Sequence, residues 1–261
     1  MATVINTDAC IVPPNINSVV VATTDVGYVN VLDFGAVADA VINFVPVGGY
    51  TENPFATDNT VAFQAALDYS ALHRKNLYVP AGFYYCSGTL YVGSIHLGPR
   101  RGQHIYGDAS ELSVIIGNRV DMFNLDQINE GSITFNTIGM WGRHRGPLVP
   151  YTTNYTGTAI SRPVGNGANS NVRVRLNEVV FRNWETALDG TNGSWLSEIV
   201  KCDFLYCRYG LKLKDSYSVT IKNNNFGCGT AIHSPTSALL QCEISDNHFG
   251  LGIFQEVTDI I

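Results

Sequence analysis

Charged residues are scarce in this sequence. Asp, Glu, Lys and Arg make up 15% of the 261 residues, whereas about a quarter is usual in globular proteins. The chain is instead rich in Gly, Asn, Thr and aromatic residues, a composition that favours strands and turns over exposed helices. The apolar fraction of 45% excludes a mainly disordered chain. The net charge of −6 argues against nucleic acid or an anionic membrane as the main partner.

The sequence also lacks the features of a secreted, membrane-spanning or metal-stapled protein. The segment Met1–Asp8 has no basic region and no long apolar run, so we expect no secretory signal. The run Val19–Ala22 is far too short to cross a membrane, so we expect no membrane insertion. The cysteines form neither a C-x-x-C pair nor a Cys/His metal spacing; we expect buried reduced thiols and no metal or cofactor, with a disulfide or metal site as the alternative. They are Cys10, Cys86, Cys202, Cys207, Cys228 and Cys242.

The first third of the chain contains the one convincing helix. Residues 1–27 are polar and irregular and indicate an extended arm, followed by a short strand over Val29–Ala36. Residues 40–56 contain Gly and Pro and indicate a loop. Thr57–Leu72 is predicted to be helical, because either of its first two side chains can cap free N–H groups and one face is small or apolar. Asn76–Tyr85 predicts a strand, a Pro-Gly corner and a second strand.

From residue 76 onward, short apolar runs repeat with a nearly fixed period. Four runs share an apolar residue, a second position three residues later and a Phe two residues after that. An earlier run, Ile133–Ile138, has the same internal spacing. A fixed period with strand-type residues and no helix in between predicts stacked β-coils, each burying the apolar edge of the next. The Phe positions are Phe181, Phe204, Phe226 and Phe249, and a second apolar position follows at Leu188, Leu211, Ile232 and Ile253 or Phe254.

The position two residues before each Phe is also predicted to form a column. It reads Asn136, Val179, Cys202, Asn224 and Asn247 along the chain. An Asn that recurs at a bend can hydrogen-bond the backbone of its own and the adjacent coil, and so pair polar groups that a corner would leave unpaired. We therefore interpret these residues as a structural ladder; contact with a ligand is the alternative.

Three early segments carry a resemblance to a known family. They are Val31–Asp39, Thr57–Leu67 and Leu77–Tyr84, and Ile105–Asp108 continues the pattern. Together they resemble the opening segment of the pectate-lyase-like right-handed β-helix proteins, most closely bacteriophage tailspikes and related virion proteins. The chain departs from the family pattern in an insertion that follows Asp39.

The resemblance implies an all-β fold: a single-stranded right-handed parallel β-helix with an N-terminal arm and one capping α-helix. It implies an arm at 1–27, an opening strand, loop and capping helix at 28–75, and coils over 76–261 with a long loop at about 141–170. By analogy with tailspikes, we expect a homotrimer in a virion, made in the host cytoplasm. We expect its arm to attach to other virion or tail proteins and its coils to be able to contact host-surface polysaccharide.

One pair of carboxylates is the candidate catalytic site. Enzymes of this family act on polysaccharide along one outer face, and glycoside hydrolases use Asp/Glu pairs that are about 5–5.5 or 6.5–9.5 Å apart. The predicted register places Glu178 and Asp203 on adjacent coils within reach of that range. The alternative is ordinary solvated surface charge. The sequence signatures of polygalacturonases and pectate lyases, including the Asp cluster that holds Ca²⁺, are absent.

The predicted loop at 141–170 is the second candidate site. Aromatic faces stack on the C–H surfaces of sugars, and Arg can bind an acidic sugar carboxylate through two hydrogen bonds. The same residue types also anchor contacts between proteins, so an inter-subunit contact or a plain loop is the alternative. The candidate residues are Trp141, Arg143, Arg145, Tyr151 and Tyr155.

Three functions are compatible with these patterns. The first is a tailspike-like or virion-associated β-helix protein with a structural role, a glycan-binding role or both. The second is a depolymerase, a hydrolase or lyase that cleaves capsule or lipopolysaccharide. The third is a purely structural adaptor or decoration protein. Because the family's catalytic signatures are absent, we favour a binding or structural part over an enzyme.

Overall fold

The structure is a computed structural model of the whole chain, and its description covers most of the β-helix. The predicted arm lies outside the described residues except for Gly27, as do Ile253 and Phe254 of the second apolar column. The described residues are 27–45, 49–93, 102–118, 120–125, 130–143, 156–162, 171–191, 197–214, 218–234 and 241–250.

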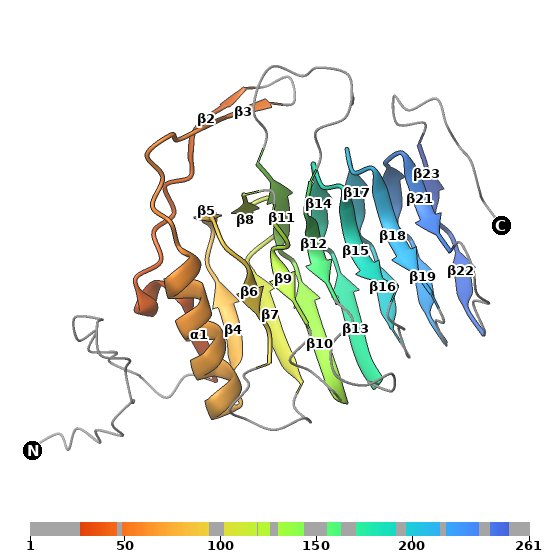
Figure 1. The fold of residues 1–261 in the computed structure, drawn as a ribbon, viewed down its shortest axis with the longest axis horizontal. Helices are drawn as coiled ribbons and strands as arrows, with labels where there is room; N and C mark the ends of the chain where they lie inside the picture. Colours follow the sequence, from red (N-terminus) through yellow and green to blue (C-terminus); the bar gives the residue numbers. More distant parts are fainter. Residues whose placement is uncertain are drawn as a thin grey trace, which may run out of the picture.

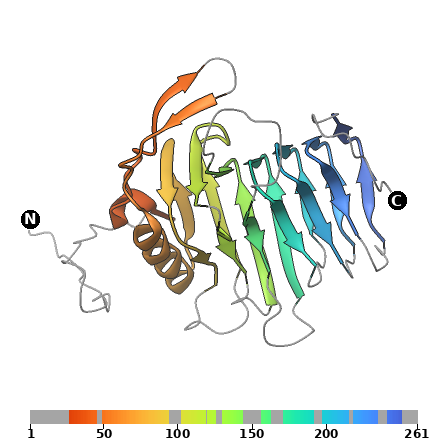
Figure 2. The ribbon, with the colours of Figure 1, turned by 45° about the horizontal axis from the view of Figure 1, so that its top comes forward.

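Three parallel sheets run side by side along the molecule (Figures 1 and 2). The first sheet contains β1 (Tyr28–Asn30), β4 (Asn76–Val79), β7 (Gln103–Gly107), β10 (Glu130–Asn136), β13 (Asn171–Asn177), β16 (Glu198–Val200), β19 (Thr220–Lys222) and β22 (Glu243–Ser245). The second contains β5 (Gly82–Cys86), β8 (Ser113–Gly117), β11 (Gly139–Gly142), β14 (Val180–Arg182), β17 (Asp203–Leu205), β20 (Asn225–Gly227) and β23 (His248–Phe249). The third contains β6 (Leu90–Tyr91), β9 (Phe123–Asn124), β12 (Thr158–Ser161), β15 (Thr186–Gly190), β18 (Tyr209–Leu213) and β21 (Thr230–His233).

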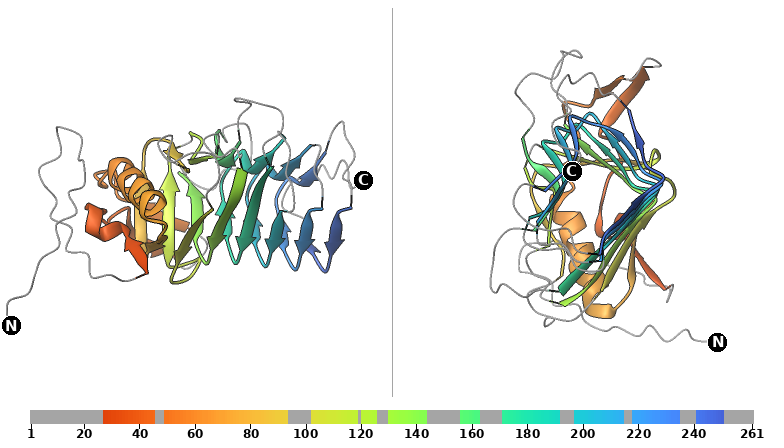
Figure 3. Two further views of the ribbon diagram at one scale, coloured as in Figure 1. Left: turned by 90° about the horizontal axis from the view of Figure 1, so that it is seen from below. Right: turned by 90° about the vertical axis from the view of Figure 1, so that its right-hand side faces the viewer.

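Each coil visits the first, second and third sheets in turn before the chain advances to the next coil. Strands therefore pair with strands three places away in sequence, as β13 does with β10 and β16. Seen along the long axis, the sheets form the walls around one shared interior (Figure 3). This is a right-handed parallel β-helix with one α-helix in its described part, and the predicted fold class is confirmed.

The predicted Phe column forms the centre of the core. Phe181, Phe204 and Phe226 are buried, and their rings stack nearly parallel with centroids 5.1 and 4.6 Å apart. Phe249 continues the column with its ring 5.3 Å from Phe226. The stacking follows from in-register parallel pairing, which places each ring directly above the previous one. The second apolar column is also in register, from Leu188 through Leu211 to Ile232.

The asparagine ladder is present at the corner between the first and second sheets. Asn224 Oδ1 accepts the Cys202 N–H at 2.8 Å, and Asn224 Nδ2 donates to Ile199 O at 2.9 Å. Asn247 repeats the pattern one coil later by accepting the Asn224 N–H at 2.9 Å. These bonds pair the corner's backbone groups, which supports the structural interpretation.

The prediction for Asn136 is wrong. This residue lies in β10, in register with Asn177 rather than with Val179, and its Oδ1 accepts a 2.6 Å bond from Asn177 Nδ2. Ile138 takes the position in the ladder column instead, because Val180 N donates to Ile138 O. The run at 133–138 has the right spacing but begins two residues too early in its coil.

The same corner contains a row of left-handed backbone conformations. In each coil from β10 onward, one residue there has φ between 50° and 56°, and none of them is Gly. Their position is shared because each of these coils makes the same tight turn from the first sheet into the second. The residues are Thr137, Glu178, Lys201, Asn223 and Asp246.

The N-terminal end is covered by helical structure (Figure 1). The predicted first strand ends early, at Asn30, and a 3-10 helix, η1 (Val31–Phe34), follows up to Gly35, whose φ is 88°. Helix α1 (Thr60–His73) buries Phe63, Ala66, Leu67 and Ser70 against the first coil. Asp58 precedes α1 and ties its start to the sheets: its carboxylate accepts from Thr60 N at 3.0 Å, from Ser87 N at 3.0 Å and from the Ser87 hydroxyl.

The sequence predicted a loop over residues 40–56, and this prediction is wrong for part of the insertion after Asp39. It forms an antiparallel pair of strands, β2 (Val41–Val45) and β3 (Gly49–Glu52), at the upper left of Figure 1. Chain beside this pair packs on the outer face of the second sheet, where Ala40, Val114, Ile116 and Trp141 form a separate apolar cluster. The second sheet is therefore buried on both faces at its N-terminal end.

Candidate functional site

The predicted pair Glu178 and Asp203 lies at the corner between the first and second sheets. Glu178 follows β13, and Asp203 begins β17 one coil later. Each carboxylate has a partner along the stack: Lys201 Nζ lies 3.3 Å from Glu178 Oε1, and Asn225 Nδ2 donates to Asp203 Oδ1 at 3.0 Å. Both groups thus belong to a row of paired polar side chains, and their catalytic role stays a prediction.

The second candidate set is only partly within the described residues. Trp141 lies in β11 and is fully buried, its ring 5.6 Å from that of Phe83 and 4.7 Å from the Arg182 guanidinium. It is not a loop residue that a sugar could reach, because the chain after Asp39 covers this face of the sheet. Arg145, Tyr151 and Tyr155 lie outside the described residues.

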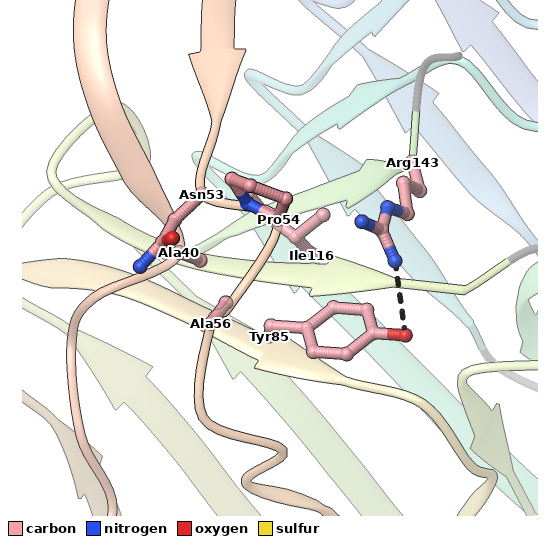
Figure 4. A pocket seen from close by; sticks show the side chains of 7 residues that line it. All are labelled: Ala40, Asn53, Pro54, Ala56, Tyr85, Ile116 and Arg143. Atoms are coloured by element: carbon pink, nitrogen blue, oxygen red, sulfur yellow. Dashed lines mark hydrogen bonds between the residues drawn. The ribbon is translucent and has the colours of Figure 1, made fainter.

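Arg143 follows β11 and lies at the edge of a small cavity (Figure 4). Its Nη1 donates to the Tyr85 hydroxyl at 3.2 Å, and the guanidinium carbon lies 4.9 Å from the centre of the Tyr85 ring. The cavity volume is about 20 Å³, which holds a water molecule but no sugar ring. Arg143 therefore binds within its own fold, and this cavity does not form a glycan site by itself.

A different group of side chains gathers on the third sheet. Asp189 in β15, Lys212 in β18 and His233 in β21 occupy the same register position on three consecutive coils. All three side chains are partly exposed, next to buried Leu188 and Leu211 in the same strands. We call Asp189, Lys212 and His233 the third-sheet row. A carboxylate, an ammonium group and an imidazole thus lie one coil apart.

Tyr209 is the centre of this group. Lys212 Nζ lies 4.3 Å from the centre of the Tyr209 ring, Arg208 Cζ lies 5.2 Å from it, and the His233 ring centre lies 5.3 Å from it. Cations within about 6 Å of an aromatic face are attracted by its negative quadrupole. The ring therefore holds two cationic side chains together on a chain whose net charge is negative.

Two carboxylates, those of Glu185 and Asp189, lie near this group and have hydrogen-bond or ion-pair partners other than Lys212. Arg208 Nη1 lies 3.0 Å from Glu185 Oε1, so this charge is paired. Asp189 Oδ1 accepts bonds from the N–H and hydroxyl of Thr191. Among the described carboxylates, none is within ion-pair distance of Lys212. Lys212 is thus a cation held in place by an aromatic ring and available to an anionic or polar ligand.

Sequence reasoning did not identify the third-sheet row. Asp189 and Lys212 are 23 residues apart, and Lys212 and His233 are 21 residues apart. Each spacing is one coil, so the repeat already aligned the three residues. The available signal was that Leu188, Leu211 and Ile232 each precede one member of the row.

The buried cysteines are not candidate nucleophiles. Cys86, Cys202, Cys207 and Cys228 are buried free thiols, and Cys242 is half-buried. Burial is the main cause that raises the pKa of Cys202 and of Cys228 to about 12, so both thiols stay protonated at neutral pH. The described residues contain no cluster of three His, Cys, Asp or Glu side chains that could hold a metal ion. No helix in the described ranges is long and apolar enough to cross a membrane.

Comparison with known proteins agrees with the geometry of the coils. A family model described as rhamnogalacturonase A/epimerase, pectate lyase-like, matches residues 28–251. No curated protein sequence matches the chain.

Several solved structures share the fold at low sequence identity. The catalytic unit of an α-1,3-glucanase from Streptomyces thermodiastaticus superposes with a TM-score of 0.56 at 18% identity, over 88% of this chain and 37% of that one. The Streptococcus pneumoniae surface protein and adhesin PfbA gives 0.54 at 19% identity, over 85% and 61%. An Acinetobacter phage tailspike protein gives 0.50 at 14% identity, over 90% and 45%. The chain thus spans between about a third and three fifths of the length of these structures, and the likeness shows the fold.

Proposed function

The chain belongs to the rhamnogalacturonase A/epimerase, pectate lyase-like family, and we propose that it binds host-surface polysaccharide as a tailspike-like part of a bacteriophage virion. Its structural neighbours include a tailspike, an adhesin and a glucanase. We assign the glycan-binding site to the third-sheet row and Tyr209.

The observation that carries the proposal is Lys212, which is held over Tyr209 and has no carboxylate partner among the described residues. A sugar hydroxyl or carboxylate can accept a charge-assisted hydrogen bond from its ammonium group, and such bonds contribute about 1.5–3 kcal/mol. Asp189 and His233 lie one coil on either side and offer further polar contacts. The row runs along the stacking axis, the direction in which an extended chain of sugars could lie across several coils.

A binding experiment tests this function. Affinity electrophoresis of the full chain in gels containing purified capsular polysaccharide or lipopolysaccharide would measure retardation. We expect Lys212→Ala to weaken binding about 10-fold or more, because it removes the charge-assisted bond. The matched control is Lys222→Ala on the first sheet, whose ammonium group lies 3.8 Å from Glu243 and 3.6 Å from Asp246. Equal weakening by both variants, or by neither, would refute the assignment.

The second candidate function is cleavage of the same polysaccharide. Asp189 and His233 favour it, because a carboxylate and an imidazole flanking one position are the groups that general acid–base catalysis uses. Incubation with polysaccharide, followed by assay for new reducing ends or unsaturated products, separates cleavage from binding. Products that disappear in Asp189→Asn but persist in Glu178→Gln and Asp203→Asn would locate catalysis on the third sheet; the opposite pattern would restore the corner pair.

We further propose that the chain forms a homotrimer in the virion and attaches to other virion proteins through the arm at residues 1–27. Family resemblance to tailspikes supports this setting. Size-exclusion chromatography with light scattering should give three times the mass of one chain, and a stable monomer would refute the trimer. Mass spectrometry of purified virions should detect the protein.

A further inference from the structure

Tyrosine side chains gather on the outer face of the first sheet, at its N-terminal end. Tyr28 comes from β1, Tyr78 from β4 and Tyr106 from β7, three strands that pair in that order. Each is partly exposed, while the next residue in its strand is buried. Because side chains alternate along a strand, the three rings point away from the core. We call Tyr28, Tyr78, Tyr106 and the neighbouring His104 the tyrosine patch.

The rings of the tyrosine patch contact one another. Tyr78 and Tyr106 are in register and stack with their ring centres 5.2 Å apart. Tyr28 lies beside this pair, 5.2 Å from Tyr78 and 6.4 Å from Tyr106, and its plane is at 75° and 84° to theirs. The His104 ring centre lies 5.4 Å from that of Tyr106. The four rings therefore form one continuous cluster on the outside of the sheet.

The tyrosine patch also offers polar groups. Among the described residues, the hydroxyls of Tyr28 and Tyr106 have no hydrogen-bond partner. The Tyr78 hydroxyl donates to Asp108 Oδ1 at 2.6 Å. Two phenol groups can thus donate to and accept from a ligand.

The charges around the tyrosine patch favour an uncharged ligand. Within the described ranges, no Lys or Arg side chain lies over a ring of the patch. Burial lowers the pKa of His104, so its ring is neutral at neutral pH. The carboxylate in contact with the patch, that of Asp108, is exposed and would repel an anion. The third-sheet row differs, because there a cation is held over the ring.

We propose that the tyrosine patch binds a neutral saccharide at a site separate from the third-sheet row. Aromatic surface packs against the C–H faces of sugars, and phenol hydroxyls exchange hydrogen bonds with sugar hydroxyls. This combination of aromatic rings and a few polar groups is typical of small-ligand sites. The inference goes beyond the proposed function, because it assigns a second site and a different class of ligand. It does not depend on Lys212.

The size of the tyrosine patch favours a small ligand over a protein partner. Three neighbouring strands span about 10 Å, and the outward positions of His104 and Tyr106 on one strand lie about 7 Å apart. The patch therefore covers on the order of 100 Å². A stable interface between proteins buries about 800 Å² on each partner.

Affinity electrophoresis of the full chain tests the proposal. The gels contain laminarin, dextran or galactomannan as neutral probes, and alginate as the acidic comparison. We expect at least one neutral polysaccharide to retard the protein. The combined Tyr28→Ala and Tyr106→Ala variant should weaken this binding about 10-fold, because two ring contacts are lost. The combined Tyr28→Phe and Tyr106→Phe variant keeps the rings and should weaken it about 5-fold through the lost hydroxyls.

The matched control is Tyr206→Ala, which removes an exposed tyrosine from the corner after β17. This control should bind as the parent does, and the thermal midpoint checks the fold of each variant. The proposal would be overturned if no neutral gel retarded the protein, if only alginate did, or if Tyr206→Ala weakened binding equally. A rise in mass with protein concentration that the Tyr28→Ala and Tyr106→Ala variant abolishes would also overturn it, since the patch would then bind a second copy.

Discussion

Replacing Phe204 by Ala tests whether the stacked rings stabilise the coils. Phe204 is fully buried, and its ring lies between those of Phe181 and Phe226. Phe→Ala in a core typically costs about 3–5 kcal/mol, since it removes transfer free energy and leaves a cavity. Two stacked partners are lost together, so we expect a loss of about 4 kcal/mol in the free energy of unfolding.

Phe249→Ala is the matched comparison, because Phe249 occupies the same column. Its side chain is 44% exposed and has one ring neighbour among the described residues, Phe226. Roughly half the buried surface and one aromatic pair are lost there, so we expect a cost of about 1–2 kcal/mol. The difference between the two variants should therefore be about 2–3 kcal/mol.

Urea unfolding followed by far-UV circular dichroism measures both variants. Fluorescence should be recorded in parallel, because long repeat arrays can unfold in more than one step. If Phe204→Ala is no more destabilised than Phe249→Ala, the rings do not act as a continuous column. The same result would show that burial at this position is of little consequence for stability.

Three other predictions follow from the described contacts. Burial raises the pKa of Asp58, but the hydrogen bonds from Ser87 and Thr60 outweigh it and lower the pKa to about 2. In the unfolded chain the pKa is about 3.9, so the ionised carboxylate stabilises the fold above that pH. This contribution, about 1 kcal/mol after solvent screening, should be lost as the pH falls from about 4 to 2. Asp58→Asn should flatten that part of the curve of stability against pH, and an unchanged acid titration would contradict it. Asn224→Ala should cost about 1–3 kcal/mol by urea unfolding, because it leaves a buried N–H unpaired; the partly exposed Asn225→Ala should cost less. Trp141→Ala should cost about 3–5 kcal/mol by urea unfolding, and a near-neutral result would show that the chain after Asp39 does not pack on this sheet.

The periodic part of the fold could be predicted from the sequence. A coil of 22 or 23 residues places equivalent side chains above one another, so the Phe column and the ladder at Asn224 and Asn247 follow from spacing alone. The same reasoning failed at Asn136, because a longer coil separates it from Asn177 and spacing does not fix the register across such an insertion. Local pattern determines register only where the period is unbroken.

Contacts between distant segments could not be predicted. Trp141 is buried because chain from residues 40–56, about a hundred positions earlier, covers the outer face of its strand. No feature next to Trp141 in the sequence indicates this cover. Likewise, Tyr209 brings Lys212 and His233 together through ring contacts that depend on side-chain direction.

The row of left-handed residues at the first corner has a consequence for protein engineering. A left-handed conformation costs a residue with a Cβ atom roughly 1–2 kcal/mol, and Asn and Asp carry less of this strain than other residues. Thr137, Glu178 and Lys201 are therefore conformationally unfavourable choices at surface positions. Exchanging them for Asn would raise thermal stability in small increments without repacking the interior. The corner is a series of equivalent positions, one per coil from β10 onward, where this β-helix could be strengthened or could display new side chains at a regular interval.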